Sequence, residues 1–272
     1  MIRPLKNSGY TLLEALIFIV ISSFIFISAF AMFNGRQGQV QYRQSVRELD
    51  SKIQTVINDV STGFFPNTEF SCSLGDFGDT QLNIEPISSN QQGTREECVF
   101  VGKAVSYDNT QQDQLAIHAI AAANPPLGSA RSILDNHEDV QLTAIDILKN
   151  SYTTAWGLEI TRIVISSDPS DDLSSEPINY FAYLSDIGNN SNTSSSLESG
   201  QQAVNLYTSD SNFADFPNGL RQVSPDEAIY LCLDIEVVNQ KAVIVLGADG
   251  RQLSTSINQD AEQEYGVVCE WD

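Results

Sequence analysis

The stretch Gly9-Tyr10-Thr11-Leu12-Leu13-Glu14 decides how this chain is organised, because one long apolar run follows it directly. Residues 15–33 are 19 uncharged residues, mostly Ile, Phe, Leu, Val and Ala. A helix needs about 17–25 apolar residues to cross a bilayer, so this run is long enough to span one. A carboxylate at the centre of such a helix costs roughly 2.5–3.5 kcal/mol. We therefore treat Glu14, at the head of the run, as a functional residue.

A short polar leader precedes this stretch and carries two positive charges, Arg3 and Lys6. The pattern Lys6-x-x-Gly9-Tyr10-Thr11-Leu12-Leu13-Glu14, followed by an unbroken apolar helix, resembles the type IV prepilin family over about the first 50 residues. That family prefers Phe after the cleaved bond, and Tyr10 keeps an aromatic ring there. Many major pilins have a Pro inside the apolar helix. This chain has none there, and Gly35 and Gly38 are its nearest helix-weakening residues.

The resemblance implies a specific maturation and set of partners. It implies cleavage between Gly9 and Tyr10 by a prepilin peptidase, followed by N-methylation of Tyr10. It also implies that Glu14 pairs with the N-terminal amine of a neighbouring subunit as the filament assembles. The implied partners are other pilin subunits, the inner-membrane assembly platform and the peptidase. The protein would cross the cytoplasmic membrane once, with its head on the extracytoplasmic side, and reach a filament at the cell surface after assembly.

Three other interpretations of the apolar run compete with this one. A signal anchor would use Arg3 and Lys6 for orientation, but it has no use for Glu14. A secretory signal peptide is suggested by Ala29-Phe30-Ala31, which imitates a small-residue cleavage site, although the run exceeds the usual apolar region of about 7–15 residues. A buried core helix is least favoured, because nothing else in the chain is apolar enough to surround it.

Beyond Gly38 the helix is predicted to continue with one apolar face. Apolar residues recur there at alternating spacings of 3 and 4, as in an amphipathic helix. They are Tyr42, Val46, Leu49, Ile53, Val56, Ile57 and Val60. A coiled coil is the alternative, but the stripe covers under three heptads. Gly63 and Pro66 predict the end of the helix.

Four segments follow from these boundaries. Residues 1–9 form the predicted prepilin leader, and 10–34 the transmembrane or filament-core helix. Residues 35–60 are its amphipathic continuation, and 61–272 form an exported head.

The charge of the head restricts its partners. The chain has a net charge of −21, and residues 61–272 contain 8 basic against 31 acidic residues, a net charge of −23. Proteins bind nucleic acids largely by neutralising phosphates with Lys and Arg. Direct nucleic-acid binding by the head is therefore disfavoured, and the acidic residues are better explained as keeping an exported protein soluble.

The head is predicted to be mainly β, which gives an α+β fold with a long N-terminal helix packed on a mainly antiparallel sheet. Strands are expected at 97–106, 114–122, 156–166, 178–184, 228–238, 241–247 and 251–257, with a further candidate at 266–271. A short helix is expected at 138–149, and 186–202 is expected to be a surface loop. Residues 99–103 and the closing meander also look somewhat like minor pseudopilins of the H type, over about a quarter of the head.

The chain has four cysteines, all on the predicted exported side, which permits disulfides. Four cysteines allow three pairings. We predict Cys72–Cys98, which would close the loop after the helix, and Cys232–Cys269, which would link the ends of the C-terminal meander. A metal site is the alternative, but the sequence has no Cys-x-x-Cys, and His118 and His137 have no partner at ligand spacing.

A calcium site is a further candidate, because Asp168, Asp171, Asp172 and Glu176 cluster in one loop and Ca²⁺ takes several oxygen ligands. The spacing does not match an EF-hand, so a solvated loop is favoured and no cofactor is predicted.

Two classes of function remain. The first is a minor pilin or pseudopilin, a structural subunit of a type IV pilus or type II secretion filament, placed at or near its tip. The second is a membrane-anchored surface adhesin or binding protein that never enters a filament. An enzyme is a distant third, since the sequence has no nucleophile elbow, phosphate loop or zinc motif. His118 is expected to be a strand residue and His137 to lie in a solvated turn.

Overall fold

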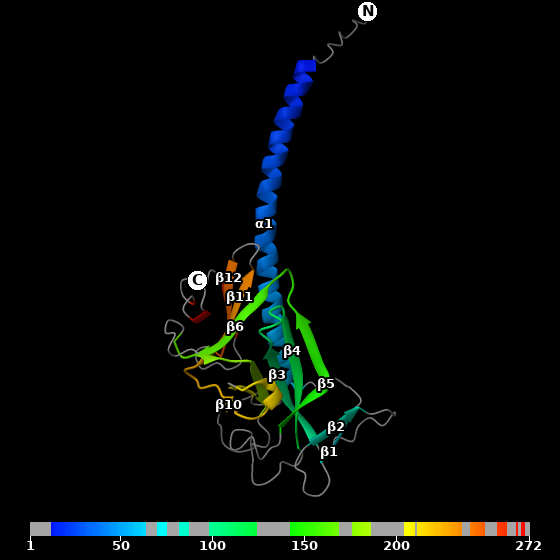
Figure 1. Cartoon of the computed structure of the whole chain (residues 1–272), viewed down its shortest axis with the longest axis vertical. Helices are drawn as coiled ribbons and strands as arrows, with labels where there is room; N and C mark the ends of the chain where they lie inside the picture. The colour runs from blue at the N-terminus through cyan, green and yellow to red at the C-terminus, as the bar shows by residue number, and fades with distance from the viewer. Residues whose placement is uncertain are drawn as a thin grey trace, which may run out of the picture. The chain divides into compact units, whose positions relative to one another are not determined.

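The computed structural model of the chain combines one long helix with mainly antiparallel strands (Figure 1), which confirms the predicted α+β class. It describes residues 12–63, 70–74, 82–86, 98–123, 142–168, 176–185, 204–209, 211–235, 240–247, 255–259, 265 and 268–269. The chain divides into two compact units, Met1–Gln44 and Ser45–Asp272. The second unit therefore contains the latter part of the helix together with the strands.

Helix α1 runs from Leu12 to Ser61 without interruption, a length of about 75 Å at 1.5 Å per residue. Its second half carries the predicted apolar stripe on one face. The buried residues of this stripe are Tyr42, Val46, Leu49, Ile53, Val56, Ile57 and Val60. The spacing of apolar residues along the sequence thus predicted both the continuation of the helix and the face that it buries.

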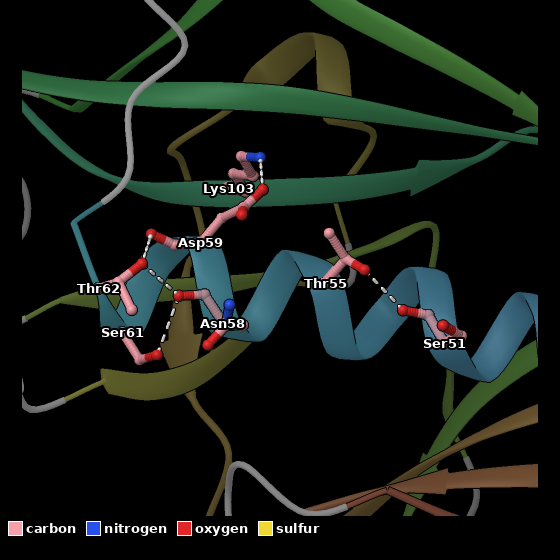
Figure 2. Close-up of polar contacts among 7 residues, drawn as sticks. All are labelled: Ser51, Thr55, Asn58, Asp59, Ser61, Thr62 and Lys103. Atoms are coloured by element: carbon pink, nitrogen blue, oxygen red, sulfur yellow. Dashed lines mark hydrogen bonds and ion pairs between the residues drawn. The ribbon is translucent and has the colours of Figure 1, made fainter.

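At the end of the helix, side-chain hydroxyls add hydrogen bonds to the last backbone carbonyls (Figure 2). The Asn58 carbonyl accepts bonds from the Thr62 amide at 3.0 Å, the Thr62 hydroxyl at 2.7 Å and the Ser61 hydroxyl at 3.0 Å. Gly63 follows with φ 63°, the left-handed conformation in which glycine commonly ends a helix. The predicted end is confirmed at Gly63, while Pro66 lies outside the described residues.

The larger sheet has six strands in the order β10-β9-β8-β3-β4-β5, and every neighbouring pair is antiparallel. Its strands are β3 (Cys98–Tyr107), β4 (Gln114–Ala123), β5 (Leu142–Thr153), β8 (Tyr180–Ser185), β9 (Val204–Ser209) and β10 (Arg221–Gln222). Lys103 on β3 contacts Asp59 on α1, so the face of β3 that carries Lys103 packs on the helix. Side chains alternate along a strand, so Ala104 and Ser106 lie on the opposite face.

The second sheet has five strands in the order β13-β12-β11-β6-β7. They are β6 (Glu159–Ser166), β7 (Glu176–Pro177), β11 (Ala228–Ile235), β12 (Gln240–Leu246) and β13 (Thr255–Gln259). Two further strands, β1 (Phe70–Leu74) and β2 (Leu82–Pro86), form a separate antiparallel pair. The predicted C-terminal meander is confirmed, because β11, β12 and β13 pair antiparallel in sequence order.

The two larger sheets are joined through the end of β3. The Tyr107 hydroxyl donates a hydrogen bond to the Ile160 carbonyl on β6. Next to it, the Ile160 amide donates to the Gln112 carbonyl at 2.7 Å, and the Thr154 amide donates to the Asp113 carbonyl at 2.8 Å. These bonds fix the β3–β4 turn against the connection between β5 and β6.

Gly102 allows β3 and β8 to approach closely. A Cβ atom at this position would lie 2.1 Å from the Tyr183 carbonyl oxygen of β8, a distance that no side chain can occupy. The register of β3 against β4 also shifts between Phe100 and Gly102. Glycine is therefore required here by the neighbouring backbone rather than by its own φ angle.

Two sequence predictions in the head are wrong. The short helix expected at 138–149 is instead strand β5 from Leu142 onward. The pairing of β5 with β4 is irregular between Ile117 and Ala119, and such a bulge breaks the alternation of apolar residues that marks a strand. The spacing that remained resembled that of a helix.

The strand candidate at 266–271 is also wrong, since Val268 and Cys269 are helical. Cys269 is bonded to Cys232 on β11, a strand already paired on both sides by β6 and β12. The closing segment therefore approaches the face of the sheet and cannot add a strand beside β11. The other predicted strands are present, with ends shifted by up to four residues, and the predicted loop at 186–202 lies outside the described residues.

Candidate membrane and assembly segment

The N-terminal part of α1 is long and apolar enough to cross a membrane. The qualifying segment is Leu12–Phe30, 19 residues, and none of it is buried. The large side chains that it exposes are Leu12, Leu13, Leu16, Ile17, Phe18, Ile19, Val20, Ile21, Phe24, Ile25, Phe26, Ile27 and Phe30. A core helix of a soluble protein would have much of this surface covered. The exposure therefore agrees with a helix whose surroundings are supplied from outside the chain.

The polar side chains inside this segment are satisfied by the helix itself. The Ser23 hydroxyl donates to the Ile19 carbonyl at 2.7 Å, and the Ser28 hydroxyl donates to the Phe24 carbonyl at 2.8 Å. Because both donors bond within the helix, neither needs water or another helix. These serines therefore do not prevent the segment from lying in an apolar environment.

Glu14 is the only ionisable residue between Leu12 and Phe30, and it lies in the first turn of α1. A carboxylate is favourable at this end of a helix, where the first backbone amides point outward and carry a partial positive charge. The structure thus places Glu14 at the start of the apolar segment, as predicted. Gly9 and Tyr10, the predicted cleavage and methylation residues, lie outside the described residues.

The latter part of α1 is attached to both larger sheets by polar contacts. Asp59 forms an ion pair with Lys103 on β3, and the two side chains are only 18% and 15% exposed (Figure 2). The Gln54 amide donates to the Asp50 carboxylate at 2.8 Å and to the Thr255 hydroxyl on β13 at 3.0 Å. Together with the buried stripe, these contacts hold the C-terminal part of the helix rigidly within the second unit.

Sequence reasoning missed the pair of Asp59 and Lys103. A signal for Lys103 existed, because it occupies a position between Gly102 and Ala104 inside a strand of mainly apolar residues. A charged residue inside such a strand needs a partner of opposite sign when it is buried. What the sequence could not show is that the partner lies 44 residues earlier, near the end of the helix.

The predicted disulfide between Cys232 and Cys269 is present, with the two Cα atoms 5.6 Å apart. It joins β11 to the closing helical residues across a separation of 37 residues. Val268 and Cys269 pack in a core with Val164, Tyr230 and Val243. The side chains of Cys72 and Cys98, although on β1 and β3, lie outside the described residues, so their pairing stays a prediction.

The candidate metal and catalytic residues have ordinary structural surroundings where they are described. His118 is a buried residue of β4, as expected, and its Nε2 atom lies 3.0 Å from the Ser106 hydroxyl. Asp168 is exposed, and its backbone is hydrogen bonded to the Ser166 hydroxyl. His137, Asp171 and Asp172 fall outside the described residues. Among those that are described, no three His, Cys, Asp or Glu side chains gather closely enough to hold a metal ion.

Burial raises the pKa of several tyrosines. It raises the pKa of Tyr107 and of Tyr152 to about 12, with nearby carboxylates adding to the effect. The pKa of Tyr183 is raised further by complete burial and then by the charge of Asp50. These phenols remain protonated at neutral pH, and the Tyr107 hydroxyl donates a hydrogen bond to the Ile160 carbonyl.

Comparison with protein-family models, with curated proteins and with solved structures gives no match.

Proposed function

We propose that the protein is a minor pilin or pseudopilin, a structural subunit of a type IV pilus or of a type II secretion-like filament. The observation that carries this proposal is Glu14 at the head of an exposed apolar helix that continues, unbroken, as the amphipathic helix of a β-rich head. A simple membrane anchor explains the apolar surface but leaves the carboxylate without a role. A filament subunit uses both features.

The role of Glu14 follows from where its charge is favourable. In a lipid bilayer a carboxylate at the start of a spanning helix lowers the stability of the inserted monomer. In a filament, the N-terminal amine of a neighbouring subunit supplies a positive charge at the same level. Charge attraction is strong where water is scarce, so the pair favours the assembled state over the free subunit.

The sequence before the helix supports maturation by a prepilin peptidase. Removing the leader after Gly9 creates the new amine at Tyr10, only four residues before Glu14 and at the start of the apolar segment. The large β head supports incorporation at or near the filament tip. Before assembly, the helix lies in the cytoplasmic membrane and the head lies on the extracytoplasmic side.

This function is tested by following the endogenous protein in its own cells. We expect N-terminal mass analysis to find methylated Tyr10, and we expect antibodies to the head to detect the protein in sheared, membrane-free filaments. A mature N-terminus at Met32 would instead establish a secretory signal peptide. An unprocessed N-terminus, with all protein left in the membrane fraction, would favour the alternative of an anchored surface adhesin.

A further inference from the structure

A polar groove of about 740 Å³ lies over β3, β4 and β5, on the sheet face that points away from α1. Ser106 of β3 lines the groove. Lys103 of the same strand points toward α1, and side chains alternate along a strand, so Ser106 lies on the face away from the helix. None of the residues that line the groove belongs to α1. The groove therefore calls for a role of its own.

The floor of the groove is made by a row of small side chains. Ser106 on β3 pairs with Ala116 on β4, and Ala116 pairs with Ser151 on β5. Residues that pair directly across antiparallel strands lie on the same face of the sheet. Three small side chains in one row leave a trough that crosses the strands. A larger residue in any of the three positions would fill it.

One wall of the groove is the aromatic ring of Phe213, which is held in place by contacts with other rings. Phe213, in the short 3-10 helix η2 (Phe213–Asp215), is partly exposed and lies against the buried His118 ring with 4.1 Å between ring centroids. It also meets the Tyr180 ring edge-on at 5.3 Å. His118 is in turn fixed by its contact with Ser106. The exposed part of the Phe213 ring is thus a rigid apolar surface beside the trough.

The remaining walls are rich in side-chain amides. Five of the fifteen lining residues are Asn or Gln, namely Asn109, Gln111, Gln114, Asn179 and Asn212. The Asn179 amide donates to the Asn212 side chain at 3.3 Å, which ties β8 to the wall that carries Phe213. The turn between β3 and β4 is braced by a hydrogen bond from the Gln111 backbone N–H to the Asp108 backbone carbonyl at 2.9 Å.

The charge of the groove selects against ionic ligands. Among the lining residues, Asp108 and Lys149 are the only members of the Asp, Glu, Lys and Arg types, one of each sign, and hydrogen bonds from Thr110 hold the pKa of Asp108 below its usual value. The surrounding head has a net charge of −23, which repels anions. An apolar ligand is equally unsuited, since sites for such molecules are lined mainly by hydrophobic side chains.

We propose that this groove binds a neutral saccharide chain. Sugar hydroxyls both donate and accept hydrogen bonds, as do the side-chain amides that line the groove. The C–H faces of a sugar ring are apolar and can pack on the exposed part of the Phe213 ring, whose negative π surface attracts their weakly positive hydrogens. The trough of Ser106, Ala116 and Ser151 gives the chain room to lie across the strands.

The test uses the full-length protein in a detergent without a sugar headgroup. The protein is applied to an array of neutral oligosaccharides of glucose, galactose, mannose and N-acetylglucosamine. Sialylated oligosaccharides and random peptides are on the same slide. We expect retention on neutral saccharides only. Calorimetry with the best-retained saccharide then gives the affinity of each variant.

Ser151→Trp should fill the trough and weaken binding at least tenfold while leaving the melting temperature unchanged, because Ser151 is exposed. Asn150→Trp is the matched control, since Asn150 is exposed, adjacent and on the opposite face of β5. Phe213→Ala should also weaken binding. Absence of any neutral-saccharide binding, equal binding by Ser151→Trp, or retention on peptides alone would each overturn the proposal.

Discussion

Asp59 near the end of α1 and Lys103 in the middle of β3 form an ion pair at the interface between helix and sheet, with both side chains mostly covered. A charge in such a place costs free energy unless its partner is present. The pair therefore does more to specify where the helix lies on the sheet than to stabilise the fold. This distinction can be measured.

Lys103→Met leaves the Asp59 carboxylate covered and without its cation. Removing one partner of a buried pair costs about 3–5 kcal/mol, and we expect about 1–3 kcal/mol here because some solvent reaches both groups. The double variant Asp59→Leu/Lys103→Met should be more stable than Lys103→Met alone. Urea unfolding followed by circular dichroism measures all three, and a double variant less stable than either single one would contradict this account.

Glu14→Ala separates insertion from assembly. Removing the carboxylate should not harm membrane insertion, since the charge is unfavourable in lipid. We expect normal cleavage and normal membrane levels but loss from sheared filaments, with Glu14→Asp intermediate because it keeps the charge and shortens the reach. Recovery of Glu14→Ala in filaments at the wild-type ratio would show that this carboxylate is not the docking element.

Gly9→Val tests the maturation step. A branched side chain would crowd a peptidase site that accepts glycine, so the precursor should keep residues 1–9 and retain its positive leader. Immunoblotting for the slower-migrating precursor checks this, with Ser8→Ala as the control that should still be cleaved. Efficient processing of Gly9→Val at the same bond would count against a prepilin peptidase.

Cys232→Ala removes the disulfide that ties the closing segment to β11. For a loop of 37 residues the entropic model gives a loss of about 4 kcal/mol. Cys269→Ala should cost nearly the same, and the double variant should cost no more than either alone. Thermal unfolding of the two single variants and the double variant under identical conditions measures this. Strictly additive losses from the two single variants would show that the effect is packing rather than the covalent link.

Gly102→Ala tests the close approach of β3 and β8. The new methyl group would meet the Tyr183 carbonyl, so one strand must shift, at a cost of about 1–3 kcal/mol or more. Gly157→Ala is the comparison: it has open space around it but φ 71°, so only backbone strain of about 1 kcal/mol is expected. Chemical unfolding of both variants measures the two losses in free energy of unfolding, and we expect the larger loss for Gly102→Ala. A larger loss for Gly157→Ala would show that backbone strain outweighs the contact between strands.

The sequence predicted the helix and the strands of the C-terminal meander because each carries a local pattern. The stripe from Tyr42 to Val60 repeats every three to four residues, and β11 and β12 are nearly continuous apolar runs separated by a short turn. Strand β5 could not be predicted in this way, because its bulge opposite His118 interrupts the alternation. A local pattern reports local geometry, and a bulge is imposed by the neighbouring strand.

The polar groove could not be predicted at all. Its floor takes one small residue from each of three strands, and its aromatic wall comes from a loop near residue 213. None of these residues stands out in the sequence, where Ser106, Ala116 and Ser151 are ordinary members of their strands. Only strand order and register bring them together. Glu14 was recognisable because a single residue contrasts with its neighbours.

The continuity of α1 has a mechanical consequence. Force applied along the helix axis reaches the head through the whole buried stripe from Val46 to Val60, about 21 Å of helix, and through Asp59 near its far end. These contacts are loaded in shear, all at once, and cannot be peeled apart one by one. Traction along this part of α1 is therefore shared among all of these contacts.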